Sequence, residues 1–162
     1  MSNDGSTGAA TGKGRTTLRM AGVMFIISAV LELFSVGSTG MLAGSMLSGV
    51  PAAAYHLVFA AMYLAVGIGL WGLKPWAYPV TLAAVALYTI DQLAFIADPA
   101  SVEAWVEMQL GGMQGMAGLD ELVDKGQIAD MARLMAMVIL VCWWGFAAYV
   151  VHRRRLFKPD GD

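Results

Sequence analysis

Four ionisable side chains interrupt the long apolar runs of this sequence, and their types suit them to chemistry: Glu32, His56, Asp91 and Arg133. A charged side chain inside a membrane span costs about 2.5–3.5 kcal/mol on insertion scales, so such residues usually form pairs or serve a function. Two are acids and two are bases, so helices that turned them inward would place anions opposite cations. Two neighbours of Asp91 in the sequence, Tyr88 and Gln92, could join this polar cluster.

The polar cluster has two competing interpretations. A polar pocket open to one face of the membrane could bind a small ligand, an ion or a quinone head group, or it could relay protons. The same residues could instead form an ion-pair and hydrogen-bond network that fixes helix packing, as polar residues do between membrane helices. Basic side chains can also snorkel to the interface, which applies to His56 and Arg133. Glu32 and Asp91 have shorter side chains and lie deeper, so they form the stronger pair.

Methionines in the connections between the apolar runs form a second candidate site. Thioether sulfur is a soft ligand that suits Cu(I), and the candidate ligands are Met108, Met113 and Met116. Methionine also fills irregular apolar space, and metal-binding loops usually contain more His, Cys or Met per residue than this segment does. Copper therefore stays an alternative, and we predict no other cofactor.

The elements that must position these residues are four apolar runs, at 18–37, 52–73, 76–97 and 128–151. Each has about 20 or more residues, enough to cross a hydrocarbon core of about 30 Å at 1.5 Å per residue. Lipid offers the backbone no hydrogen bonds, so runs of this length must be helical. Hydrophobic residues make up 58% of the chain and charged residues only 14%. The sequence therefore predicts an all-α integral membrane four-helix bundle over residues 18–155.

Lysine and arginine placement predicts the orientation of the bundle. Basic residues precede the first helix, occupy the turn between the second and third at Lys74, and follow the fourth at Arg153, Arg154 and Arg155. If the helices alternate, all of these lie on one side, and the positive-inside rule makes that side the cytoplasm. We expect a bacterial inner-membrane protein with both termini cytoplasmic, and the four ionisable residues then lie in the outer half of the bilayer. The three arginines are a topology anchor, and they could also contact anionic lipid.

The remaining segments are connections and tails. Residues 1–17 are rich in Gly, Ser, Thr and Ala and are expected to be a disordered cytoplasmic tail, and residues 156–162 form a second tail. The outer connection 38–51 is small and uncharged, which indicates a flexible loop. The longer connection 98–127 predicts a short amphipathic helix through Leu110, suited to lie on the membrane surface.

The turn Gly69–Ala77 resembles one found in small four-helix bacterial inner-membrane proteins, and this resemblance implies topology and no activity. The net charge of −2 gives no basic footprint for nucleic acid. The sequence carries no recognisable nucleophile–base pair, phosphate loop or haem motif, so we do not expect an enzyme.

Three functional hypotheses follow. The first is a non-catalytic accessory or assembly subunit of a larger membrane complex. Its protein partner, or a second copy of the chain, would contact the aromatic residues of the last helix, Trp143, Trp144 and Phe146. The second is a small oligomeric transporter or proton-coupled carrier that uses an outer-side acidic pocket. The third is an outer-facing protein that binds a ligand or copper.

Overall fold

The computed structural model describes residues 5–111 and 124–157. Its main elements are helices long and apolar enough to cross a membrane, namely α1 (Gly5–Phe34), α2 (Gly49–Trp71), α3 (Ala77–Ala97) and α6 (Lys125–His152). These four are the candidate spans found in the described part of the chain. The prediction of an all-helical bundle with four candidate membrane-spanning helices is therefore confirmed. The shorter elements are α4 (Pro99–Gly111), η1 (Arg154–Phe157) and two strands.

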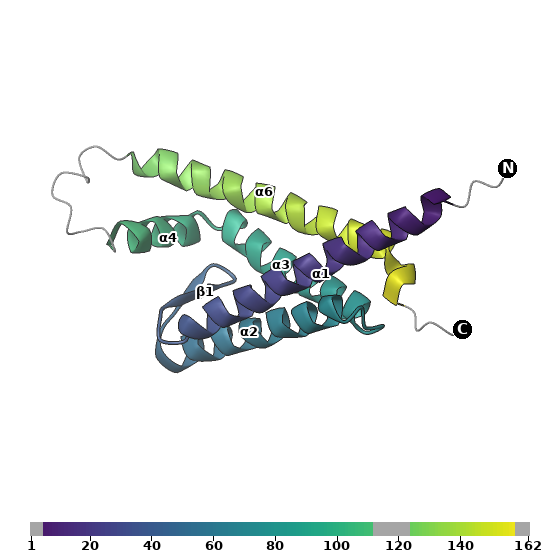
Figure 1. Ribbon diagram of the computed structural model, residues 1–162. Helices are drawn as coiled ribbons and strands as arrows, with labels where there is room; N and C mark the ends of the chain where they lie inside the picture. Colours follow the sequence, from purple (N-terminus) through teal and green to yellow (C-terminus); the bar gives the residue numbers. More distant parts are fainter. Residues whose placement is uncertain (1–4, 112–123, 158–162) are drawn as a thin grey trace.

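The bundle has two distinct ends (Figure 1). The start of α1 and the 3-10 helix η1 lie at one end, together with the turn between α2 and α3, and we call this the terminal end. The strands, α4 and the start of α6 lie at the opposite end, which we call the hairpin end. The α1 and α2 helices run side by side along their length, whereas α6 lies mainly against α3.

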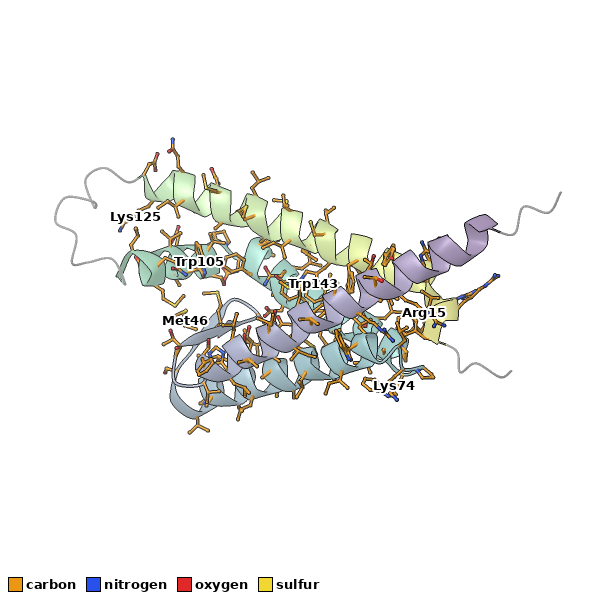
Figure 2. All side chains as sticks on the ribbon, viewed as in Figure 1. Arg15, Met46, Lys74, Trp105, Lys125 and Trp143 are labelled. Atoms are coloured by element: carbon orange, nitrogen blue, oxygen red, sulfur yellow. The ribbon has the colours of Figure 1, made fainter. Side chains whose placement is uncertain are left out.

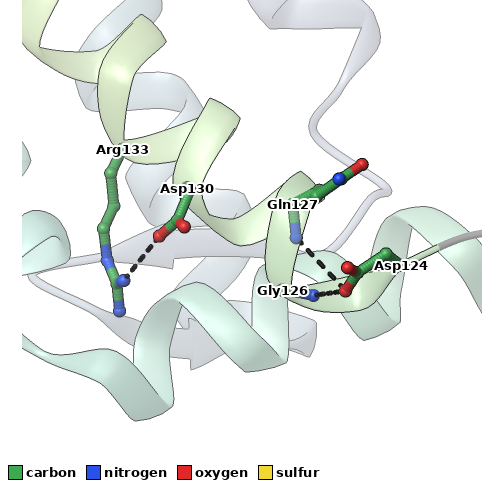
Figure 3. Close-up of polar contacts among 5 residues, drawn as sticks. All are labelled: Asp124, Gly126, Gln127, Asp130 and Arg133. Carbon is green, nitrogen blue, oxygen red and sulfur yellow. Dashed lines mark hydrogen bonds and ion pairs between the residues drawn. The ribbon is translucent and has the colours of Figure 1, made fainter.

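Several helix boundaries differ from the predicted ones. The α1 helix ends at Phe34 rather than 37, and α2 covers Gly49–Trp71 rather than 52–73. The α1 helix begins at Gly5, inside the segment expected to be a disordered tail. Extending an existing helix fixes one residue for each new hydrogen bond, which is easier than starting one. The α6 helix begins three residues before the predicted 128, because Asp124 caps it: its Oδ1 accepts hydrogen bonds from the N–H groups of Gly126 (2.9 Å) and Gln127 (3.4 Å) (Figure 3).

An apolar core fills the terminal end. Its buried residues come from all four long helices and from η1: Leu18, Val66, Leu70, Ala77, Ala84, Val150 and Phe157. Phe157 lies in the segment expected to be a tail, yet it is only 3% exposed, because η1 turns back against α3 and α6. This end of the bundle is therefore closed by well-packed apolar side chains.

Glycines allow α1 and α2 to approach closely. A Cβ atom on Gly22 would lie 2.7 Å from the backbone nitrogen of Trp71, and one on Gly67 would lie 2.9 Å from the carbonyl oxygen of Gly22. Small residues serve this purpose between membrane helices, where close backbone contact replaces the hydrophobic effect as the driving force.

Replacing Gly67 by alanine is expected to destabilise the bundle by about 1–3 kcal/mol, because the added methyl group overpacks the contact between α1 and α2. Gly145→Ala on α6 is the matched control, since no described atom lies within 4 Å of its Cβ position. The measurement is unfolding of the detergent-solubilised protein. Equal stability of the two variants would contradict this packing.

The connection between α1 and α2 is a β-hairpin rather than a flexible loop. Strand β1 (Gly40–Leu42) pairs antiparallel with β2 (Ser45–Leu47), with Met41 opposite Met46. Ala43 and Gly44 form its two-residue turn with φ angles of 48° and 81°, as tight hairpin turns require. A side chain at Gly44 would collide with the Ser101 hydroxyl, so glycine also allows the hairpin to sit against α4.

Candidate functional site

A cavity of about 650 Å³ lies inside the hairpin end of the bundle. Its lining residues come from α1, α2, α3, α4, α6 and the β-hairpin. The polar ones are Glu32, Thr39, Tyr55, His56, Asp91 and Gln92. The α6 helix supplies an apolar wall made of Ile128, Met131, Ala132, Met135, Ala136 and Ile139. The cavity therefore has one polar side and one apolar side.

Glu32 and His56 form a hydrogen-bonded pair at the polar side. The Glu32 Oε1 atom lies 2.7 Å from Nδ1 of His56. Glu32 lies near the end of α1 and His56 near the start of α2, so the antiparallel packing of these helices brings them together. His56 is only 6% exposed, and the carboxylate partner is what allows a buried imidazole to be satisfied at Nδ1.

The second imidazole nitrogen of His56 has no hydrogen-bond partner among the described residues. It lies against Gly40 of the hairpin, where a Cβ atom would be 3.5 Å from Nε2. In the tautomer whose Nδ1–H donates to Glu32, Nε2 keeps a bare lone pair and acts as an acceptor.

Asp91 holds the hairpin from the side of α3. Its Oδ1 atom accepts the backbone N–H of Ala43 at 2.7 Å, and Asp91 is 9% exposed. Among the described residues, its Oδ2 atom has only the Gln92 amide as a hydrogen-bond partner, at 3.5 Å. One oxygen of this buried carboxylate thus fixes the hairpin turn, and the other retains most of its capacity to accept a hydrogen bond.

Ser101 holds the same turn from α4. Its hydroxyl lies 2.7 Å from the Gly44 carbonyl oxygen and also contacts the Asp98 carboxylate. Asp98 further accepts the N–H of Ala100 at 3.1 Å. The Ser101 hydroxyl is the main cause that lowers the pKa of Asp98 below its ordinary value of 3.8. These contacts join the end of α3, α4 and the turn of the hairpin, whose Gly44 lines the cavity.

Ser101→Ala is expected to raise the pKa of Asp98 toward its ordinary value, because the carboxylate loses its main hydrogen-bond donor. In the wild type this contact stabilises the fold at pH values above the ordinary pKa of an aspartate. The stabilisation is lost as the pH falls through the lowered pKa of Asp98. Carboxyl-carbon NMR titration of labelled Asp98 measures both proteins. An identical titration midpoint in the two proteins would contradict the contact.

The structure brings together four of the six predicted cluster residues: Glu32, His56, Asp91 and Gln92. Arg133 does not line the cavity, and its Nη1 atom lies 3.3 Å from Oδ1 of Asp130, one turn earlier on α6 (Figure 3). The α6 helix turns Ala132 and Ala136 toward the cavity, so Arg133 lies beside the wall. Tyr88 packs its ring against Trp143 instead, at 5.3 Å between ring centroids.

The methionines that line the cavity differ in part from those predicted as copper ligands. Met108 lines the cavity, and its sulfur lies 3.5 Å from the Thr39 hydroxyl. Met113 and Met116 lie outside the described residues. Three other methionines line the cavity with Met108, namely Met41, Met131 and Met135. In the described part of the chain, no group of three or more His, Cys, Asp and Glu side chains is placed to hold a metal ion.

Three aromatic rings also line the cavity, and the sequence did not single them out as site residues. Tyr55 comes from α2, Phe95 from α3 and Trp105 from α4. Trp105 lies on α4 at the hairpin end (Figure 2), and its ring is edge-on to that of Phe95, with 6.5 Å between the ring centroids. The sequence placed Trp105 in a short amphipathic helix expected to lie on the membrane surface, so it gave no signal for a place in a cavity.

The aromatic residues of α6 are divided between the bundle and its surface. Trp143 and Phe146 pack on Phe25 of α1, with centroid distances of 5.4 and 5.7 Å. Trp144 is 51% exposed, and its indole N–H donates to the Thr89 hydroxyl at 3.1 Å. Two of the three residues expected to face lipid or a partner, Trp143 and Phe146, therefore join α6 to α1.

The arginines at the terminal end follow α6 directly. The Arg153 guanidinium lies over the Tyr149 ring, 5.8 Å from its centroid, while Arg154 and Arg155 are exposed. Their exposure leaves them accessible at the same end as Arg15 and Lys74 (Figure 2).

Comparison of the chain with protein families, with curated proteins and with solved structures finds no match.

Proposed function

We propose that this protein binds a small amphiphilic molecule in the cavity at the hairpin end, and that this end faces the outside of a bacterial inner membrane. The observation that supports it most is the two-sided lining of the cavity, with ionisable residues opposite the apolar face of α6. The volume of about 650 Å³ falls within the range of about 300–1,000 Å³ that is usual for small-molecule sites.

The shape of the apolar wall suits the nonpolar body of such a ligand. The wall runs from Ile128 to Ile139 on α6, which is about 16 Å at 1.5 Å per residue. Two of its residues are methionines, Met131 and Met135, whose flexible side chains adapt to ligands of different shape. A ligand would lie along α6 with its polar end toward Glu32 and Asp91.

Charge placement supports the proposed orientation. Arg15, Arg19, Lys74 and the three arginines after α6 lie at the terminal end, while Lys125 and Arg133 belong to the start of α6. The positive-inside rule then puts the terminal end in the cytoplasm. We also propose that α4, which borders the cavity, lies near the outer membrane surface.

A binding role accounts for the arrangement better than a carrier role does. A carrier needs a route from the cavity to the opposite face. Between the cavity and the terminal end, the described residues form the apolar core around Val66, Leu70 and Val150, and the glycine contact of α1 with α2. The cavity is therefore a site with access from the hairpin end.

Native mass spectrometry of the protein purified in mild detergent tests the proposal. We expect a small molecule bound at one per chain. Ala132→Phe should remove it by filling the apolar wall, whereas Ala148→Phe, on an exposed face of the same helix, should retain it. Absence of any bound molecule from all three proteins would contradict the proposal. A second protein at fixed ratio would instead support the accessory-subunit hypothesis.

A further inference from the structure

We infer that the ligand carries a protonated amine, so that the cavity selects hydrophobic organic cations over neutral or anionic amphiphiles. This inference rests on the proposed function and specifies its substrate class. It stands on three features of the cavity lining: the balance of charge, the excess of hydrogen-bond acceptors, and the aromatic rings that border the polar side.

The charge balance of the lining is negative. Glu32 and Asp91 are its carboxylates, and among the described residues that line the cavity, His56 is the one basic side chain. Even a protonated His56 would neutralise only its partner Glu32, at 2.7 Å, and Asp91 would remain. Asp91 is 9% exposed, and a buried charge is costly unless it is paired. A cationic ligand would supply the missing partner, and an anionic one would be repelled.

The hydrogen-bonding groups point to a donor rather than an acceptor. Among the described residues, Oδ2 of Asp91 has only the long contact of 3.5 Å to Gln92. Nε2 of His56 is buried beside Gly40 and has no partner in the same part of the chain. In the tautomer whose Nδ1–H donates to Glu32, this buried nitrogen carries a lone pair and adds to the negative potential of the cavity without itself contacting a ligand. An ammonium group has three donors and no acceptor, so it complements the Oδ2 atom of Asp91.

The aromatic rings complete a site for an organic cation. Tyr55, Phe95 and Trp105 line the same cavity as Asp91, from three different helices. A cation near the face of an aromatic ring is attracted by the ring quadrupole, most strongly where water is excluded. The apolar wall of α6 would then hold the hydrophobic part of the ligand.

The test compares three small molecules of similar shape and different charge: 2-phenylethylamine, 2-phenylethanol and phenylacetate. Binding is measured by isothermal titration calorimetry at neutral pH, with the full chain in nanodiscs of zwitterionic lipid. We expect the amine to bind about tenfold or more tighter than the alcohol, as a charge-assisted hydrogen bond would give. Phenylacetate should bind weaker than both.

Asp91→Asn should lower the affinity for the amine by about tenfold or more relative to that for the alcohol, so that the selectivity for the amine is lost. Asp130→Asn removes the same charge from an exposed position on α6, with a side chain that is 82% exposed, and should leave the amine unchanged. The selectivity of the wild-type protein tests the inference even if Asp91→Asn fails to fold. Equal binding of amine and alcohol, tighter binding of phenylacetate, or no binding of the amine would each overturn it.

The two proposals fail in different ways. If 2-phenylethanol or phenylacetate binds as tightly as the amine and Ala132→Phe abolishes that binding, the amphiphile site stands and the amine class is wrong. If none of the three binds and native mass spectrometry finds no bound molecule, both proposals are wrong.

Discussion

Replacing Glu32 by alanine is expected to destabilise the bundle by about 1–3 kcal/mol, the cost of leaving a buried polar group without its partner. The affected group is His56, which is 6% exposed and whose Nδ1 lies 2.7 Å from the Glu32 carboxylate. Nε2 already lacks a partner among the described residues, so the variant leaves both ring nitrogens unsatisfied. Equilibrium unfolding in mixed micelles measures the effect.

Two further variants separate the parts of this interaction. Glu32→Gln keeps an oxygen that can accept the Nδ1–H bond, so it should cost less than Glu32→Ala. Glu107→Ala removes a carboxylate from an exposed position on α4 and should stay within about 0.5 kcal/mol of wild type. The pairing would be refuted if Glu32→Ala and Glu107→Ala changed stability by the same amount.

Asp91→Ala is expected to loosen the β-hairpin that borders the cavity. The carboxylate accepts the Ala43 N–H at 2.7 Å, and a hydrogen bond to a charged group contributes about 1.5–3 kcal/mol. Its loss should speed amide exchange at Ala43 and across the strands by about ten- to a hundredfold, since local opening sets exchange. Hydrogen exchange with mass spectrometry over residues 40–47 measures it.

The controls for the hairpin use the second contact that holds it. Ser101→Ala removes a hydroxyl whose one proton is shared between the Gly44 carbonyl oxygen and the Asp98 carboxylate. It should speed exchange by a smaller factor, because a shared neutral hydroxyl forms a weaker bond to the turn than a carboxylate does. Asp130→Ala, on α6 with a side chain that is 82% exposed, should leave exchange unchanged. Wild-type exchange at Ala43 in the Asp91→Ala protein would show that the carboxylate does not hold the turn.

The four long helices could be predicted from the sequence because their signal is local. A run of about 20 apolar residues has only one way to satisfy its backbone in lipid, and the runs at 52–73 and 76–97 correspond to α2 and α3. The acids Glu32 and Asp91 were equally accessible to sequence reasoning, since a carboxyl group within such a run demands a reason.

The rotation of α6 could not be predicted in the same way. Hydrophobic residues occupy every face of this helix, so its sequence does not indicate which face turns toward the bundle. Packing decided it: Trp143 and Phe146 contact Phe25 on α1. That rotation turns Ala132 and Ala136 toward the cavity and leaves Arg133 to pair with Asp130 along α6.

The β-hairpin was missed because its stability is not local. Its strands have only three residues each, and isolated hairpins of any length are marginal in water. What fixes it are contacts with residues far along the chain, Asp91 and Ser101. Gly40 and Gly44 are among the small residues that indicated a flexible loop. In the structure their lack of a side chain lets the hairpin lie close to Tyr55 and Ser101.

The measurement that most directly tests the central claim is methyl NMR of the protein labelled at its methionines, titrated with 2-phenylethylamine and 2-phenylethanol. The cavity claim predicts saturable shifts for the methyl groups that line it, Met41, Met108, Met131 and Met135. Met20 and Met24 are exposed on α1, at 59% and 61%, and should not follow them. Shifts of similar size and without saturation at every methionine would indicate partition into lipid, and would contradict a binding site at the hairpin end.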